Sequence, residues 1–143
     1  MENIQAKMKE LFGNSCYSYS LAYKFIGDKP IRIKYLTSCV LHGWYSGYID
    51  DDGYVSDPIN YVNKTCKSYC SKIDFPKIKD VQKLVYKKEN LTEDVNIVMF
   101  EYNKGTHFVC MNKEGDVIFD PSGDSNSVKY GVPTSIRKYI YAV

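Results

Sequence analysis

The segment HFVCMNKEGDVIFDPSG, residues 107–123, decides how the second half of the chain folds. Two short runs rich in β-branched and aromatic residues flank the turn sequence Lys-Glu-Gly-Asp, which is the pattern of a β-hairpin. A similar run, VNIVMFEYN at 95–103, comes just before it and is separated from it by a second turn, Asn-Lys-Gly. We therefore expect an antiparallel meander of short strands from Val95 onward.

The first half of the chain shows apolar residues at helical spacing instead. Helices are predicted over 2–12, from a cap at Asn14 or Ser15 to Gly27, over 31–47, and over 58–70 with Asp57 as cap and Pro58 in the first position, followed by a loop around Pro76 and a short helix. Helices come first and strands last, so the sequence predicts an α+β fold. A length of 143 residues fits one domain, residues 1–143.

Charge and composition narrow the functional classes. Nineteen basic and seventeen acidic residues give a net charge of +2, and the lysines are spread along the chain, so neither nucleic acid nor a membrane is expected as a partner. The N-terminus lacks the apolar core of a signal peptide, and no run approaches membrane-spanning length. We expect a soluble cytoplasmic protein. Its odd number of cysteines, five, favours free thiols over disulfides.

Three residues, one in the first half and two in the second, suggest nucleophilic chemistry. Cys16 falls in the first turn of a predicted helix, where the helix N-terminus and a neighbouring imidazolium favour the reactive thiolate. His107 can supply the imidazole, and Asp120 on the next predicted strand can orient its ring. Each residue alone also has an ordinary explanation: a buried small side chain, a core histidine and a turn aspartate. Together they predict a nucleophile, a base and an orienting carboxylate.

The two windows SCYSYSLAYKFIG at 15–27 and HFVCMNKEGDVIFDPSG at 107–123 resemble the papain-like cysteine peptidases, and among these the bacteriocin-leader peptidase domains of bacteria. The resemblance implies a papain-like fold without a cofactor. It also implies hydrolysis of an amide or peptide bond in a peptide or protein substrate, through a thioester acyl-enzyme. Cys16 would be the nucleophile, His107 the base and Asp120 the orienter, and the backbone N–H of Cys16 would contribute to the oxyanion hole.

Two positions depart from the pattern of that family. Glu10 stands where the family has a glutamine whose side chain helps to hold the oxyanion, which leaves Asn14 and Gln5 as candidate donors. Tyr17 places a bulky side chain beside the nucleophile, where the substrate backbone would approach. These departures keep a second hypothesis open, namely a catalytically inactive papain-like domain that binds a peptide or a protein.

The spacing Cys-x2-His followed by Cys-x3-Cys indicates a zinc site as an alternative. Its ligands would be Cys39, His42, Cys66 and Cys70. On helices, each close pair would share one face, and four nitrogen and sulfur ligands suit tetrahedral zinc. The spacing is not the commonest finger pattern, however, and the same residues are also suited to pack a helical core. The favoured interpretation is a protein without a metal.

Overall fold

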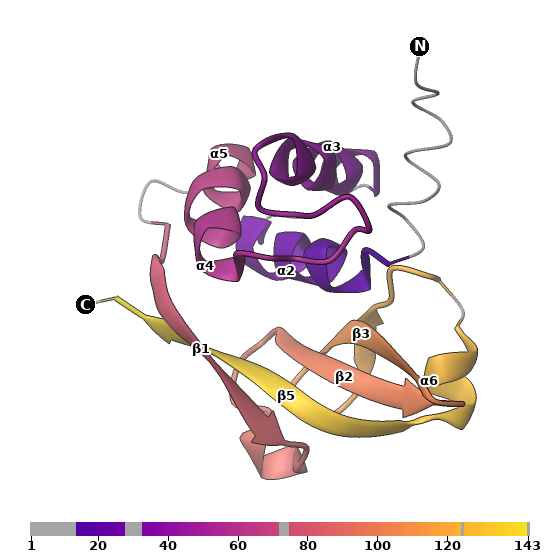
Figure 1. The fold of residues 1–143 in the computed structure, drawn as a ribbon. Coiled ribbons are helices and arrows are strands. Elements are labelled where there is room, and N and C mark those ends of the chain that lie inside the picture. The colour runs from indigo at the N-terminus through magenta and orange to yellow at the C-terminus, as the bar shows by residue number, and fades with distance from the viewer. Residues whose placement is uncertain (1–13, 28–32, 72–74, 124, 143) are drawn as a thin grey trace.

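The computed structural model describes residues 14–27, 33–71, 75–123 and 125–142, so the predicted helix at 2–12 lies outside the described part. A helical layer lies above an antiparallel sheet (Figure 1), which confirms the α+β class. The helices are α2 (Cys16–Ile26), α3 (Ile33–Tyr45), α4 (Pro58–Asn60), a π-helical segment (Tyr61–Cys66), α5 (Lys67–Tyr69), a 3-10 turn (Lys88–Asn90) and α6 (Asn126–Tyr130). The strands are β1 (Ile78–Val85), β2 (Asn96–Tyr102), β3 (Gly105–Met111), β4 (Val117–Phe119) and β5 (Val132–Tyr141).

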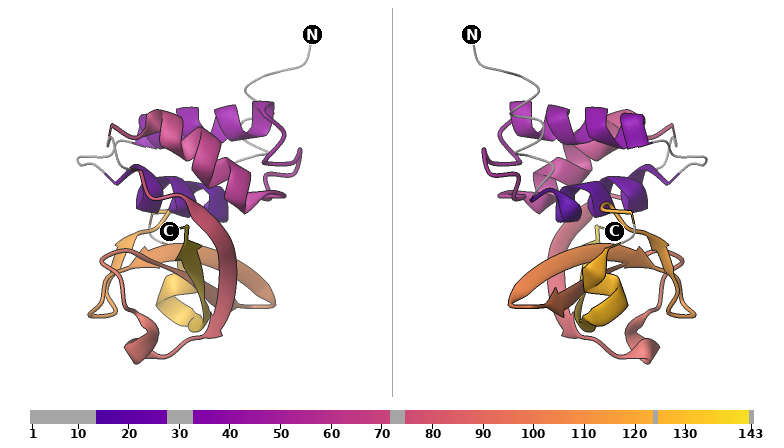
Figure 2. Two further views of the ribbon diagram at one scale, coloured as in Figure 1. Left: turned by 90° about the vertical axis from the view of Figure 1, so that its left-hand side faces the viewer. Right: turned by 90° about the vertical axis from the view of Figure 1, so that its right-hand side faces the viewer.

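Helix α2 has the predicted bounds and is the central helix of the fold. Ser15 occupies the position before its first residue, and Gly27 ends it with φ of 70°, a left-handed conformation that glycine adopts without steric cost. The helix lies between the sheet below it and the helices α3, α4 and α5 above it (Figure 2). Because both sides are covered, even its serines Ser18 and Ser20 are buried together with its apolar residues.

The helical segments after Asp57 follow one another without a break from Pro58 to Tyr69, close to the predicted helix over 58–70. The Asp57 carboxylate accepts a hydrogen bond from the Asn60 backbone N–H at 3.0 Å, so Asp57 is the expected cap. The sequence did not predict that the middle of this stretch, Tyr61–Cys66, is π-helical. The buried side chains of Tyr61–Cys66 pack against α2 and α3.

The sheet has the strand order β1-β5-β2-β3-β4, and every neighbouring pair is antiparallel. The predicted meander is confirmed as β2, β3 and β4. The prediction of a short helix after Pro76 is wrong, because Ile78–Val85 is strand β1. Its apolar residues recur at near-helical spacing, but the strand pairs along its whole length with β5, a strand that the sequence analysis did not predict. Pairing with a distant partner thus overrides the local pattern.

Both faces of the sheet are covered. The face toward α2 carries Ile97, Cys110 and Tyr139, which belong to the main core with the helices. The opposite face carries a second cluster, Leu91, Val98, Phe100, Val109, Met111 and Ile136, against which Tyr86 and Val128 pack. Strand β3 contributes side chains to both clusters, so its position is fixed from two sides.

We expect Gly43→Ala to destabilise the protein by about 1–3 kcal/mol, the usual cost of overpacking a core. A Cβ at Gly43 in α3 would lie 2.5 Å from the Tyr61 ring and 2.9 Å from Ile49. Chemical denaturation of wild type and variant measures the difference. Lys34→Ala, an exposed change in the same helix, is the control and should leave the stability nearly unchanged. Equal stability of Gly43→Ala and the control would contradict this packing.

Candidate active site

The start of α2 is held in a fixed position over strand β3. Cys16 is the first residue of the helix and is half-buried, while its cap Ser15 is fully buried. Two contacts fasten the helix to the strand: the Ser20 hydroxyl donates to the Phe108 carbonyl at 3.4 Å, and the Cys110 thiol donates to the Ser20 carbonyl at 3.5 Å. The thiol of Cys16 therefore lies above the first half of β3, where His107 is located.

His107 in β3 and Asp120 after β4 form a largely buried pair. The distance between Nε2 of His107 and Oδ1 of Asp120 is 2.7 Å, and the two side chains are only 10% and 7% exposed. The turn that follows β4 holds the carboxylate, because the backbone N–H of Ser122 also donates to Oδ1, at 2.9 Å. Asp120 thus fixes the orientation of the imidazole ring, as a second-layer carboxylate does in many sites.

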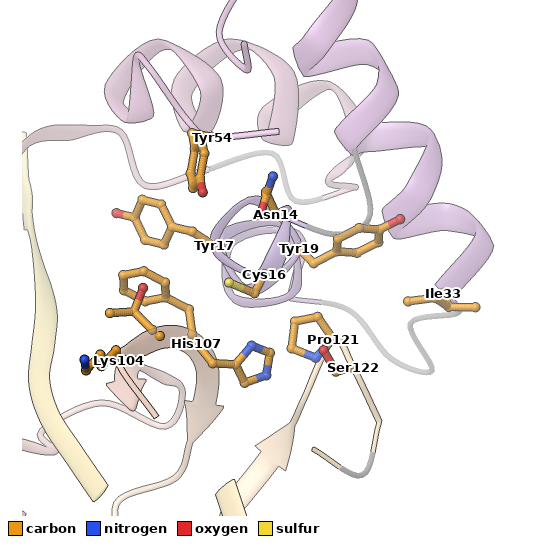
Figure 3. Close-up of a pocket in the computed structure, with 13 residues that line it drawn as sticks. Asn14, Cys16, Tyr17, Tyr19, Ile33, Tyr54, Lys104, His107, Pro121 and Ser122 are labelled. Atoms are coloured by element: carbon orange, nitrogen blue, oxygen red, sulfur yellow. The ribbon is translucent and has the colours of Figure 1, made fainter. Parts of the chain in front are cut away.

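Cys16 and His107 line the same pocket, with the Cys16 side chain above the imidazole ring (Figure 3). Since Nε2 of His107 is taken up by Asp120, Nδ1 is the ring nitrogen left to face the thiol. Burial lowers the pKa of His107, but hydrogen bonds and negative charge from Cys16 and Asp120 outweigh it, and the net result is a pKa above 6.5. The arrangement therefore favours an imidazolium beside the sulfur.

A pocket of about 690 Å³ opens onto these side chains. Aromatic rings make up much of its wall, among them Tyr17 and Tyr19, which point to opposite sides of Cys16 (Figure 3). The hydroxyl of Tyr17 is 2.8 Å from that of Tyr139, and its ring packs on Phe108 at a centroid distance of 4.6 Å. Tyr17 is thus anchored against the sheet and forms a side wall of the pocket.

The two candidate oxyanion donors have different outcomes. Asn14 lines the pocket next to Cys16, at the start of the turn that leads into α2. Gln5 lies outside the described residues, as does Glu10. The first N–H groups of a helix have no partner within the helix, which makes the N–H of Cys16 suited to an oxyanion.

The structure does not bring the four predicted zinc ligands together. The sulfurs of Cys39 and Cys66 are 3.9 Å apart in the core, but His42 packs its ring against Tyr69 instead. Burial raises the pKa of the Cys66 thiol, which keeps the sulfur neutral rather than in the thiolate form that binds zinc. Within residues 14–27, 33–71, 75–123 and 125–142, no three His, Cys, Asp or Glu side chains are placed to hold a metal ion.

One polar contact of the site was missed by the sequence analysis. The hydroxyl of Ser125 donates to Oδ2 of Asp120 at 2.6 Å. The only signal in the sequence was the position of Ser125 just before a short polar stretch, where a serine can cap a helix. Capping alone does not indicate a contact with Asp120.

Neither family models, curated protein sequences nor solved structures gave a significant match to this chain. Function is therefore inferred from the side chains and their geometry. In the described part of the chain, no helix combines the length and the apolar character needed to cross a membrane.

We expect Asp120→Asn to lower the pKa of His107, because the substitution removes the negative charge beside the ring. NMR titration of the imidazole signals measures this shift, and His42, the only other histidine, is an internal control in the same spectrum.

The raised pKa also has a consequence for stability. The folded chain holds the His107 proton more tightly than the unfolded chain, so the stabilisation is fully present below pH of about 6.5 and is lost as pH rises through the folded-state pKa. Asp120→Asn should therefore cost more stability at acidic pH than at alkaline pH. A cost independent of pH would contradict the ion pair.

Proposed function

We propose that this chain is a papain-like cysteine hydrolase that cleaves an amide or peptide bond. The single observation that carries the proposal is that a thiol at a helix start and an imidazole line one pocket, while a buried carboxylate lies 2.7 Å from Nε2 of that imidazole. A thiolate with an imidazolium as its proton donor is what nucleophilic attack on a carbonyl requires. The order of Cys16, His107 and Asp120 along the chain agrees with the papain-like pattern.

In the proposed reaction, the Cys16 thiolate attacks the carbonyl carbon of the substrate, and a C–S bond forms as the carbonyl oxygen becomes an oxyanion. The backbone N–H of Cys16 and the side chain of Asn14 donate to that oxygen. His107 gives its proton to the leaving nitrogen, the C–N bond breaks, and a thioester remains. His107 then takes a proton from water, and the resulting hydroxide adds to the thioester carbon. The C–S bond breaks, the carboxylic acid leaves, and the Cys16 thiolate and the His107 imidazolium are restored.

The pocket supports a peptide as substrate. Rings of Tyr17, Tyr19, Tyr54 and Phe108 lie around Cys16, which suits the apolar side chains of a peptide on either side of the cleaved bond. The hydroxyl groups of both tyrosines form hydrogen bonds: that of Tyr17 is 2.8 Å from the Tyr139 hydroxyl, and that of Tyr19 is 2.8 Å from the Thr37 hydroxyl. Because these side chains are already ordered, substrate binding would cost little conformational entropy in the pocket walls.

A second candidate function is peptide binding without cleavage. Two large apolar side chains on the rim of the pocket, Ile33 and Tyr54, are 53% and 58% exposed. Exposed apolar groups beside a pocket are typical of a surface that binds a partner. Such a role needs the aromatic walls of the pocket but not a reactive Cys16 paired with His107.

Thiol reactivity separates the two functions. At about pH 6, we expect iodoacetamide to alkylate Cys16 roughly 10- to 100-fold faster than Cys70, because an ordinary thiol has a pKa near 8.5 and is almost fully protonated there. Cys70 is also half-buried and serves as the internal reference. Mass spectrometry of digested protein gives both rates. His107→Ala should remove the advantage of Cys16, whereas equal rates in wild type would exclude an activated nucleophile.

Hydrolysis is tested with a mixed peptide library, with cleavage products read by mass spectrometry. Wild type should cleave and Cys16→Ser should not, while both retain the same pocket walls. Peptides that bind to wild type and to Cys16→Ser equally, without any cleavage, would instead support the binding function. Cys70→Ser is the matched control and should cleave as wild type does.

A further inference from the structure

The carboxylate of Asp120 has two oxygens, and His107 uses only one of them. Oδ1 accepts from the imidazole at 2.7 Å and from the Ser122 backbone N–H at 2.9 Å. Oδ2 accepts from the hydroxyl of Ser125 at 2.6 Å. A short hydrogen bond to a carboxylate is among the stronger ones in proteins. We propose that Ser125 is a positioning residue of this site, which fixes Asp120 so that Asp120 can hold the His107 ring toward Cys16.

The direction of the Ser125 hydroxyl is determined by its second contact. The backbone N–H of Val128 points at the same hydroxyl oxygen, at 3.4 Å, and can only donate. The hydroxyl oxygen therefore acts as acceptor toward α6, and its own proton is left for Oδ2 of Asp120. One serine thus caps α6 and donates to the carboxylate at the same time.

With both oxygens bonded, the carboxylate cannot turn about its Cβ–Cγ bond without breaking a contact. Removing the Ser125 hydroxyl leaves Oδ2 without this donor at a side chain that is only 7% exposed. A buried carboxylate oxygen that loses a donor is destabilised, so the side chain moves toward water or toward another donor. The bond between Oδ1 and His107 would then lengthen or lose its alignment.

Helix α6, which carries the Ser125 cap, is itself fastened to the sheet independently of Asp120. Val128 packs on the second core cluster, and the ring of Tyr130 lies 6.2 Å from that of Tyr102 in β2. At the end of α6, a Cβ on Gly131 would collide with the carbonyl oxygens of Ser127 and Glu101, so the chain passes very close to β2 there. Ser125 is therefore held by the sheet rather than by the residue that it positions.

The test compares Ser125→Gly, Ser125→Thr and Asn126→Ala with wild type. Glycine removes the hydroxyl but is itself accepted as a helix cap, and threonine restores the hydroxyl. Asn126 is exposed and is the first residue of α6, so Asn126→Ala changes the same helix and leaves the Ser125 hydroxyl in place. The first readout is the pKa of His107 from NMR titration, with His42 as reference; the second is the alkylation rate of Cys16 at about pH 6.

We expect Ser125→Gly to lower the pKa of His107 toward 6.5 and to slow alkylation of Cys16 by about tenfold, the scale on which supporting hydrogen bonds act on a site. Ser125→Thr and Asn126→Ala should behave as wild type. If Ser125→Gly reduces the melting temperature but leaves the His107 pKa and the alkylation rate unchanged, Ser125 only caps α6 and the inference is overturned.

This inference rests on the proposed function, but its failure can be recognised separately. The pKa of His107 is measured without substrate or turnover, so a lack of peptide cleavage does not affect that result. If wild type cleaves peptides and Ser125→Gly has an unchanged His107 pKa, only the role of Ser125 fails. If the pKa falls as expected but Cys16 is no more reactive than Cys70, the proposed hydrolase function fails and Ser125 still positions Asp120.

Discussion

The packing of α2 on β3 is the interaction on which the candidate site depends. Cys16 and His107 are far apart in the sequence, and nothing local brings them together. The contacts of Ser20 with Phe108 and Cys110 set how far the helix reaches along the strand. A shift of one residue would move the thiol away from the imidazole. The geometry of the site therefore depends on how the helical layer is positioned on the sheet. Core substitutions between α2 and β3 would change that geometry without replacing any residue of the site.

The other end of α2 is fastened by a buried charge. Lys24 donates to the Val95 carbonyl at 2.7 Å and lies 3.2 Å from Glu93, which in turn accepts from the Tyr141 hydroxyl at 2.8 Å. Burial lowers the pKa of Lys24, while Glu93 opposes that shift. Burying a charge is costly unless it is paired and hydrogen-bonded, as it is here. The helix thus meets the sheet through polar contacts at Ser20 in its middle and at Lys24 near its end, and these allow far fewer positions than apolar packing alone.

The sequence predicted the features that local patterns encode. Gly27 marks the end of α2, Asp57 caps the next helical stretch, and the two turns of the meander separate β2, β3 and β4. It did not predict β1 and β5. The segment Ile78–Val85 is a strand because it pairs with β5, and its own residues do not show the alternation typical of a strand. For the site, the sequence analysis selected Cys16, His107 and Asp120, and the structure places His107 2.7 Å from Asp120 and in the same pocket as Cys16. Ser125 was missed since its bond depends on how the chain returns after the Asp-Pro-Ser-Gly turn.

Tyr17 shows why a departure from a sequence pattern has to be judged in three dimensions. A bulky residue after the nucleophile suggests a blocked site, but the helix turns this side chain toward the sheet, where the Tyr139 hydroxyl and the Phe108 ring hold it. Tyr19 is held on the other side by Thr37 of α3. One wall is thus fixed by the sheet and the other by the helical layer. The width of the pocket at Cys16 is then set by the distance between the two layers, which the packing of α2 itself determines.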